Sequence, residues 1–508
     1  MRCITDLFEH QKKCVEKLRK IKIGALYMEQ GTGKTRTALE LIKIRLEKGR
    51  IDHAIWLCPC SVKENLRRDI ILHVGNEPKD LITICGIETL SSSIKENIRL
   101  LELVQEKKCY LIVDESNLVK NIKAKRTNNI IRLAEHCTYK LILNGTPITR
   151  NEADLFAQWY ILDWRVLGYK SYWSFAANHL EYSEIIPGKL VRCLNVDYLA
   201  EKIAPYTYQV KKEECLDLPE KTYEKVYYNL TYEQDKHYEE VADKLFFYVD
   251  EFEPNTIYRL FTGLQNVISG YKVDVIENEY EIDDEGDMYG KNKIKKTSVL
   301  GMNKSNFFFK IEDNPRIQKL LEIIDNIDDK IIIFAKYTDE INNIVEILNK
   351  KYGEDSAVAF NGELNQKKRN ENLDKFRDKS SFLIANKQCG AYGLNLQFCS
   401  YIIYYSNDWD YATRSQSEDR VHRIGQKKEN VHIIDICASH TLDERILKCL
   451  ERKENLVDAF KYEIEHTKDN KELFTWITVK TCVGSRFKYK NKKVMDLDRS
   501  DLIEDLQK

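Results

Sequence analysis

The sequence lacks a long hydrophobic run, a paired-cysteine motif and any net charge of note. No apolar stretch is long enough to cross a membrane, and the first six residues contain no signal region, so we expect no membrane partner and a cytoplasmic location, or a nuclear one in a eukaryotic host. None of the 14 cysteines belongs to a C-x-x-C pair, which argues against zinc-ribbon and thioredoxin-type sites and favours a reducing compartment. Because 80 Lys and Arg balance 81 Asp and Glu, any nucleic-acid surface must be a local basic patch.

What the chain of 508 residues does contain is a phosphate-loop pattern close to its start. The pattern consists of Gly31, Thr32, Gly33, Lys34 and Thr35. An apolar run at 23–27 precedes it and apolar residues at helical spacing follow it, so backbone N–H groups and a helix N-terminus can surround an anion. Lys34 would then reach the β- and γ-phosphates of a nucleoside triphosphate, and the Thr35 hydroxyl would ligate Mg²⁺. Met28 replaces the first glycine of the strict pattern, and the alternative is a glycine-rich turn before an ordinary helix.

A pair of carboxylates follows another apolar run. Residues 109–113 read as a buried strand, which delivers Asp114 and Glu115 at its C-terminal end. Hydrolysis of a magnesium-bound nucleotide needs one carboxylate for the metal and one to deprotonate the attacking water. The alternative, a solvated turn, is disfavoured by the phosphate loop upstream.

Gln11 lies in an expected helix about twenty residues before the phosphate loop. Its side-chain amide both donates and accepts hydrogen bonds, as recognition of adenine requires. The alternative is a solvated helix residue.

The spacing of these elements predicts an α/β fold. Further strands are expected at 54–59, 82–85 and 139–143, the last followed by Gly145, Thr146 and Pro147. Strands that alternate with helical segments indicate a parallel sheet of the nucleotide-binding kind over residues 1–150.

The middle of the chain differs in composition. Residues 151–310 are expected to form a helical protrusion and insert, with an aromatic stretch at 159–175 that packs a helical core or stacks bases. Mixed charges at helical spacing indicate a helix over 223–248. The acidic, turn-rich residues 276–293 suggest a mobile insert.

A second α/β alternation is expected over 311–450. Its strands are predicted at 330–335, 357–361, 381–385, 401–405 and 431–436. Between the last two, Arg420 and Arg423 stand three residues apart, hence on one helical face, where two guanidiniums suit a γ-phosphate. Residues 451–508 should be a helical segment and a charged tail, whose basic run at 480–493 either contacts nucleic-acid backbone or is solvated.

These motifs in this order resemble helicase superfamily two, and within it the Swi/Snf-related double-stranded-DNA translocases. The resemblance runs from about Leu7 to Arg452. It rests on the Asp114–Asn121 stretch, on Leu218-Pro219-Glu220-Lys221, on Asp408-Trp409 ahead of the run Gln416–Gln426, which ends in Arg-x-His-Arg-Ile-Gly-Gln, and on Thr441-Leu442-Asp443-Glu444. Three departures are Asn117 for the usual histidine, Asp410-Tyr411 for Asn-Pro, and the missing Arg-Arg-x-Lys before Leu218.

The resemblance implies two RecA-like parallel-sheet lobes, a helical protrusion from the first, and a compact, phage-like motor. It implies that Gln11 contacts adenine, that Lys34 and Thr35 hold phosphates and Mg²⁺, that Asp114 shares the metal and that Glu115 is the catalytic base. It further implies that Gly393 lies beside the γ-phosphate, that Arg420 and Arg423 are arginine fingers, and that Thr146 and Gln416 couple hydrolysis to the DNA-side surface.

The expected function is therefore ATP hydrolysis coupled to translocation on double-stranded DNA. Two alternatives stay open, a strand-separating helicase acting on single-stranded DNA or RNA, and a nucleotide-gated clamp that binds DNA without cycling. The sequence names no protein partner and no biological process.

Overall fold

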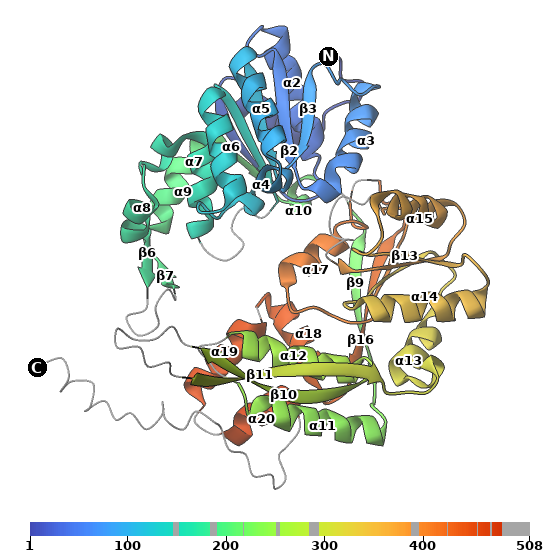
Figure 1. The fold of residues 1–508 in the computed structure, drawn as a ribbon. Coiled ribbons are helices and arrows are strands. Elements are labelled where there is room, and N and C mark those ends of the chain that lie inside the picture. The colour runs from blue at the N-terminus through green and yellow to red at the C-terminus, as the bar shows by residue number, and fades with distance from the viewer. Residues whose placement is uncertain are drawn as a thin grey trace, which may run out of the picture. The chain divides into compact units, whose positions relative to one another are not determined.

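The structure, a computed structural model, shows two compact units (Figure 1). The first comprises Met1–Glu220, Gly390–Phe398 and Gln416–Glu429, and the second comprises Lys221–Cys389, Cys399–Ser415 and Asn430–Lys508. The residues described are 1–145, 152–182, 190–216, 218–249, 254–283, 294–387, 396–423, 425–454, 456–467 and 470–479. Thr146, Gly393 and the basic run at 480–493 lie outside the described residues, so the predictions made for them remain predictions.

A six-stranded parallel sheet forms the centre of the first unit. Its order is β3-β2-β4-β5-β1-β8. The strands are β1 (Ile23–Met28), β2 (His53–Cys58), β3 (Ile82–Gly86), β4 (Cys109–Asp114), β5 (Tyr139–Asn144) and β8 (Thr207–Val210). The five strands expected from apolar runs are confirmed, and β8 joins them at the edge beside β1.

Helices cover both faces of this sheet. Ile55 and Leu57 of β2 belong to one hydrophobic layer and Trp56 between them belongs to the other, as the period-two alternation of a strand requires. The helices of the Trp56 layer are α1 (Glu9–Leu18), α2 (Lys34–Glu47) and α3 (Lys63–Val74). Those of the opposite layer include α5 (Ile94–Glu106), α6 (Lys125–His136) and α7 (Ala153–Leu167). A strand buried on both faces must be apolar throughout, which is why these strands read as continuous apolar runs.

The aromatic stretch after the first sheet mostly packs a core. Trp159 and Phe175 are fully buried, whereas the Trp173 side chain is 75% exposed. The elements here are α7, α8 (Tyr172–His179), β6 (Leu180–Tyr182), β7 (Leu190–Cys193), α9 (Val196–Ile203) and α10 (Lys212–Cys215). Of the two interpretations, core packing therefore holds for Trp159 and Phe175, and Trp173 is the exposed exception.

The second unit is built around a second six-stranded sheet, with the order β13-β14-β12-β15-β16-β9. The strands are β9 (Glu220–Tyr228), β12 (Ile331–Phe334), β13 (Ala357–Phe360), β14 (Phe382–Ala385), β15 (Tyr401–Tyr404) and β16 (Asn430–Ala438). The five strands β13, β14, β12, β15 and β16 pair in parallel in this order, which confirms a second α/β lobe. The helices that lie between Asn314 and Gln426 in the sequence are α13 (Pro315–Ile324), α14 (Thr338–Tyr352), α15 (Gln366–Asp378) and α17 (Tyr411–Glu418).

The segment 151–310 is divided between the units and does not form one protrusion of the first. Tyr238 of α11 (Tyr232–Phe246) and Phe261 of α12 (Pro254–Ile268) are buried in the same hydrophobic core as Ile333 of the second sheet. That core also takes in α18 (Leu442–Arg452), α19 (Leu456–His466) and α20 (Asn470–Thr478). The apolar faces of α11 and α12 decide this assignment, because a helix joins the unit in which it buries its apolar side.

Two other expectations for this region were wrong. Residues 220–228 form the edge strand β9 and not the start of a helix, because pairing with β16 outweighs the helical spacing of the charges. The acidic residues up to Asp283 form β10 (Tyr271–Asp283), which pairs antiparallel with β11 (Ile294–Asn306) in a register that sets Glu281 opposite Lys296. Composition indicated a mobile insert over 276–293, since it does not reveal a partner strand further along the chain; residues 284–293 lie outside the described part of the chain.

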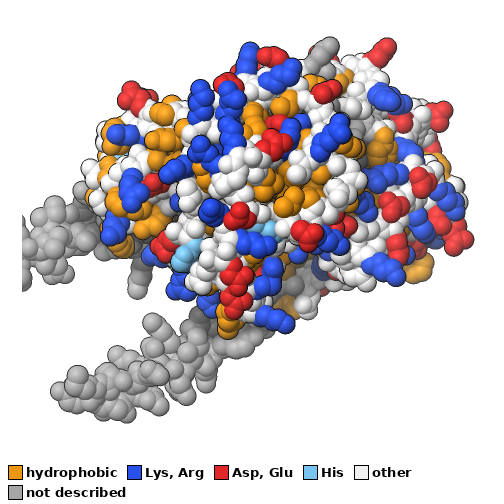
Figure 2. All heavy atoms as spheres, turned by 90° about the horizontal axis from the view of Figure 1, so that it is seen from above, with side chains coloured by type: hydrophobic (Ala, Val, Ile, Leu, Met, Phe, Trp, Pro, Cys, Tyr) orange, Lys and Arg blue, Asp and Glu red, His pale blue; other side chains and the backbone are white. Residues whose placement is uncertain are grey.

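On the face shown in Figure 2, basic and acidic side chains are interspersed among apolar ones, in keeping with the net charge of −1. Among the described residues, no helix combines the length and the apolar character that crossing a membrane requires.

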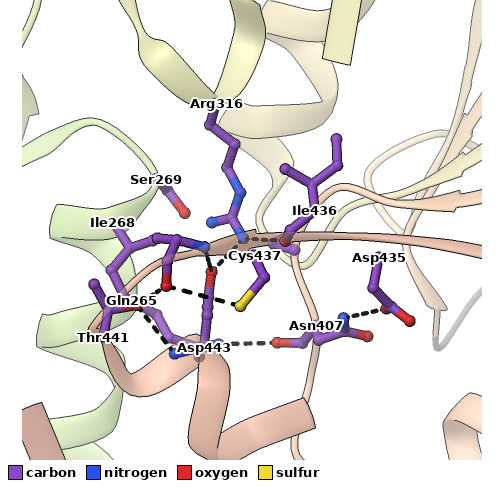
Figure 3. A network of polar contacts seen from close by, with 12 residues as sticks. Gln265, Ile268, Ser269, Arg316, Asn407, Asp435, Ile436, Cys437, Thr441 and Asp443 are labelled. Carbon is purple, nitrogen blue, oxygen red and sulfur yellow. Dashed lines mark hydrogen bonds and ion pairs between the residues drawn. The ribbon is translucent and has the colours of Figure 1, made fainter. Parts of the chain in front are cut away.

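A buried ion pair joins helices of the second unit (Figure 3). Arg316 at the start of α13 donates from Nη2 to Asp443 Oδ2 at 2.7 Å and to the Ile436 carbonyl oxygen at 3.2 Å. The two side chains are 1% and 5% exposed. Thr441 caps α18, with its hydroxyl accepting a bond from the Asp443 N–H. The Thr-Leu-Asp-Glu motif therefore has a structural role here: it starts α18 and places a carboxylate on a buried guanidinium.

We expect Asp443→Ala to destabilise the second unit by about 3–5 kcal/mol, because it leaves the Arg316 charge buried without its partner. The control is Asp374→Ala, which removes an exposed ion pair with Arg377 on α15 and should change stability by about 0.5 kcal/mol or less. Urea unfolding of the full chain, followed by circular dichroism, measures both variants. Equal midpoints for Asp443→Ala and the wild type would show that the pair contributes nothing.

Candidate functional site

Three neighbouring strands of the first sheet end at one edge. In the order β4-β5-β1, strand β4 ends at Asp114, β5 at Asn144 and β1 at Met28. Since all three are parallel, their carboxyl ends meet, and ligands of open α/β sheets bind at this edge. The sheet order thus brings the phosphate loop and the carboxylate pair together although about eighty residues separate them in sequence.

The phosphate loop has the expected form. It connects β1 to α2, and Gly31 and Gly33 have φ of +86° and +87°, a left-handed backbone that favours glycine. Lys34 is the first residue of α2, and its Nζ donates to the main-chain oxygens of Met28 at 2.9 Å and Glu29 at 3.4 Å. Thr35 follows in the first helical turn. A cation at the positive end of a helix, beside a loop of inward-turning amides, suits a phosphate group.

Gln11 of α1 lies against this loop. Its Nε2 donates to the Thr32 carbonyl oxygen at 3.2 Å and to that of Gly33 at 3.4 Å, while its Oε1 accepts from the Phe8 N–H at 3.0 Å. His10 Nε2 also bonds to the Thr32 oxygen, at 2.8 Å. In this structure Gln11 is 2% exposed and braces the loop from behind.

The carboxylate pair sits at a strained turn. Glu115 is a non-glycine residue with φ of +47° and ψ of +56°, and its N–H donates to Asp114 Oδ1 at 2.9 Å. Such left-handed backbone costs energy and gathers at functional sites. Burial and the neighbouring Glu115 carboxylate raise the pKa of Asp114 to about 7, and the Lys34 ammonium opposes that rise. Burial lowers the pKa of Lys34, whereas the nearby carboxylates of Glu115 and Asp114 raise it. Opposite charges are therefore buried together at this edge.

A buried hydrogen-bond chain leads away from the carboxylates. Ser116 donates from Oγ to Gln158 Oε1 at 2.5 Å and accepts from Asn144 Nδ2 at 3.3 Å. Gln158 Nε2 donates to the Asp154 carbonyl oxygen at 2.8 Å, within α7. The turn after β4 is thereby tied both to the end of β5 and to α7. The sequence analysis gave Ser116 no role beyond its place in the Asp114–Asn121 stretch, and it did not single out Gln158, which belongs to no chemistry-bearing pattern.

Arg420 and Arg423 lie in a turn and not on a helical face. Helix α17 ends at Glu418, and residues 419–423 form turns and bends. The expected helix stops early, because the backbone N–H groups of Arg420, Val421 and Arg423 donate to nearer carbonyl oxygens than a helix would use. The Arg423 N–H, for example, donates to the Val421 oxygen at 3.1 Å. Gln416 lies in the last turn of α17.

Both arginines nevertheless belong to the unit that holds the phosphate loop. A Cβ placed on Gly31 would lie 3.0 Å from Arg423 Cβ, so the two main chains are in close approach. Burial and the nearby Arg423 charge lower the pKa of Arg420 to about 10, while Glu115 raises it. Guanidinium, ammonium and carboxylate groups thus share one electrostatic environment.

Two family models match parts of the chain. A family model for the SNF2-related domain matches residues 78–269, and one for the helicase conserved C-terminal domain matches residues 315–425. The chain therefore contains regions that match both domains. The SNF2-related match includes Asp114 and Glu115, the helicase C-terminal match includes Arg420 and Arg423, and the phosphate loop precedes both.

Relatives of this chain include two proteins of Bacillus subtilis (strain 168). YwqA, whose name describes an ATP-dependent helicase or translocase, is 28% identical over 68% of this chain and 35% of its own length, so the chain spans about a third of that relative. The uncharacterized ATP-dependent helicase YqhH is 25% identical over 90% of this chain and 79% of its own. A solved SWI2/SNF2 ATPase core of Sulfolobus solfataricus in complex with dsDNA is 21% identical, covers 95% of this chain and 98% of that one, and has a TM-score of 0.38.

The donor set of the site fits Mg²⁺ held mainly by the phosphates of a substrate. Asp114 and Thr35 offer one carboxylate and one hydroxyl, and Mg²⁺ in nucleotide sites takes only one or two protein ligands. Within the described part of the chain, no group of three His, Cys, Asp or Glu side chains could hold a metal by itself.

Lys212 is a residue of this site that sequence reasoning missed. It is 6% exposed at the start of α10, and its Nζ donates to Asp419 Oδ1 at 2.5 Å and to the His422 carbonyl oxygen at 3.1 Å. The pair Lys211-Lys212 resembles many solvated lysines, so no sequence signal marked Lys212.

We expect Gly33→Ala to weaken binding of a fluorescent ATP analogue by about tenfold or more, as strain of 1–3 kcal/mol implies. The added Cβ would lie 2.0 Å from Gln11 Nε2, on a backbone with φ of +87°. Gly49→Ala is the matched control, since that glycine has φ of +59° but no atom within 4 Å of an added Cβ. Fluorescence anisotropy measures both, and equal affinity in the two variants would contradict a role for the loop.

Proposed function

We propose that this chain is a motor that hydrolyses ATP while it translocates on double-stranded DNA. The observation that carries the proposal is the convergence of phosphate loop, carboxylate pair and two arginines within one compact unit. A phosphate-binding lysine, a base for water and guanidiniums for the γ-phosphate are the groups that phosphoryl transfer to water needs. The names of YwqA and YqhH, an ATP-dependent helicase or translocase and a helicase, support the same activity.

Each residue has a distinct role in the proposed reaction. Lys34 and the loop amides hold the phosphates, and Gln11 keeps the loop in place or contacts adenine. Mg²⁺, held by Thr35 and Asp114, would supply charge neutralisation at the phosphates. Glu115 orients the attacking water and takes its proton, while Arg420 and Arg423 stabilise the charge that develops on the transferred group.

Hydrolysis would be coupled to DNA through the chain of hydrogen bonds from the carboxylate turn. Ser116 follows Glu115 directly and bonds to Asn144, which precedes Gly145 and Thr146. A Cβ on Gly145 would lie 3.7 Å from Lys34 Nζ, so this segment passes close to the phosphate site. By this route a change at the Glu115 turn would reach the segment that contains Thr146, and Gln416 is the second proposed coupling residue. The proposed DNA contacts track the sugar-phosphate backbone, since a motor must ignore sequence.

The first prediction concerns DNA dependence. We expect slow ATP hydrolysis by the protein alone, strong stimulation by duplex DNA and weaker stimulation by RNA. The stimulation should decline between about 50 and 200 mM salt, because phosphate contacts release counterions.

Arg423→Ala should bind ATP and lose turnover by about 10³-fold or more. Glu115→Gln, which keeps shape but not basicity, should bind ATP with hardly any hydrolysis.

Phosphate release measured with and without a 40-base-pair duplex decides this prediction. Glu102→Ala, a substitution of an exposed acidic residue on α5 of the first unit, serves as a control for general damage. Equal rates with and without duplex would leave the nucleotide-gated clamp as the better description. Near-normal turnover in Arg423→Ala would remove the arginines from the site.

One observation favours the strand-separating alternative, namely the exposed Trp173. Lys123 Nζ stands 5.9 Å from the centre of its ring, a cation beside an aromatic surface on which a base could stack. Unwinding must break stacking of roughly 1.4 kcal/mol per step, whereas tracking of the backbone leaves the base pairs intact.

The second prediction separates these two activities. In the presence of ATP we expect displacement of the third strand from a triplex, without unwinding of a tailed duplex by the same preparation. Gel assays on the two substrates measure both. Efficient unwinding that disappears in Trp173→Ala, with no triplex displacement, would establish the strand-separating helicase instead.

A further inference from the structure

Lys212 is attached at both ends to the proposed nucleotide site. Its backbone N–H donates to Glu29 Oε2 at 2.8 Å, and Glu29 is the residue that begins the phosphate loop. Its ammonium donates to Asp419 Oδ1 and to the His422 oxygen, on either side of Arg420. All of these residues belong to the first unit, although 207 positions separate Lys212 from Asp419.

The same lysine lies close to the loop itself. A Cβ on Gly31 would be 3.7 Å from Lys212 Cε and 3.0 Å from Arg423 Cβ. Gly31 of the phosphate loop therefore lies close to both Lys212 and Arg423. A further bond supports the finger-bearing segment around Arg423, from His422 Nε2 to the Pro219 oxygen at 2.9 Å.

Electrostatics explain why such an attachment is needed. Lys34, Arg420 and Arg423 are cations gathered where a polyanionic substrate would bind, so without that substrate they repel one another. Asp419 supplies a counter-charge next to Arg420, and it lowers the cost of bringing the finger-bearing segment to the loop. A carboxylate that is only 16% exposed needs a cation of its own, and Lys212 is that cation.

We propose that Lys212 is a positioning residue that holds the finger-bearing segment 419–423 against the phosphate loop through its ion pair with Asp419. The inference rests on the proposed function, since it assigns Lys212 to the ATP hydrolysis described above. Lys212 acts through Asp419 and the neighbouring arginines and need not touch the nucleotide. It organises the site before substrate arrives, so that the guanidiniums need little rearrangement during the reaction.

The experiment compares Lys212→Met, Asp419→Asn and the double variant in the full chain with duplex DNA. Lys212→Met keeps the length and volume of the side chain but removes its charge. We expect kcat for ATP hydrolysis to fall by about tenfold or more, in the range of coupling between directly bonded residues, with KM and the affinity for a fluorescent ATP analogue changed by about twofold at most. Lys211→Met is the matched control, because Lys211 is adjacent and exposed, and it should leave kcat unchanged.

The double variant tests whether the two residues act as one unit. If they do, its loss of kcat should be no larger than that of the worse single variant. Multiplied losses would show independent roles and overturn the proposal, as would an unchanged kcat in Lys212→Met.

Hydrogen exchange provides a measurement that does not depend on ATP hydrolysis. Amides of Gln416–Glu429 should exchange about tenfold faster in Lys212→Met than in the wild type, while those of α2 stay the same. If the wild type hydrolyses no ATP, the proposed function fails, and exchange alone then decides whether Lys212 holds the segment. Unchanged exchange in Gln416–Glu429 would overturn the proposal in either case.

Discussion

The first unit depends on one constraint, the parallel order β4-β5-β1 in its central sheet. Parallel strands place all their carboxyl ends at one edge, so three short turns become neighbours: the phosphate loop, the Asp114–Glu115 turn and the segment after Asn144. Two hydrophobic layers hold this order, because each strand contributes side chains to both faces. The close approach of Gly145 to Lys34, and the bond between Ser116 and Asn144, are consequences of strand adjacency.

Buried charge is the second organising feature. The site contains Lys34, Arg420 and Arg423 near Asp114, Glu115 and Asp419, and burial shifts the pKa of several of them toward the neutral form. Burying charged groups costs free energy of folding. A cluster of buried charges is therefore better explained by binding of a charged ligand than by a contribution to stability. The Arg316–Asp443 pair of the second unit differs in this respect. It joins the helices α13 and α18, and its two charges neutralise each other, so we assign it a structural role.

The division of the chain into units sets apart the segment Gln416–Glu429, which contains Arg420 and Arg423. Gln416–Glu429 belongs to the first unit, yet the residues on both sides of it belong to the second. The anchor on the second side is a buried cluster, in which Arg414 makes two bonds to Asp435, at 2.6 and 2.9 Å, and Asn407 bonds to the same carboxylate at 2.6 Å (Figure 3 shows the latter). Arg414 and Asp435, which flank the segment in sequence, are thus paired with each other within the second unit, whereas Asp419 inside the segment pairs with Lys212 within the first.

The sequence alone determined the local chemistry. Apolar runs marked every strand of the two sheets except β8 and β9, and glycine spacing marked the phosphate loop. These signals are local, since a doubly buried strand must be apolar and a loop around an anion needs left-handed backbone. Tertiary structure decided everything that depended on a partner distant in sequence. The strand β9 and the pair β10–β11 formed against the expectation from composition, because backbone pairing with remote strands outweighed local charge patterns. The end of α17 before Arg420, and the burial of Lys212 against Asp419, could not be predicted, because an ordinary lysine becomes part of a site only when the fold removes it from water beside a carboxylate.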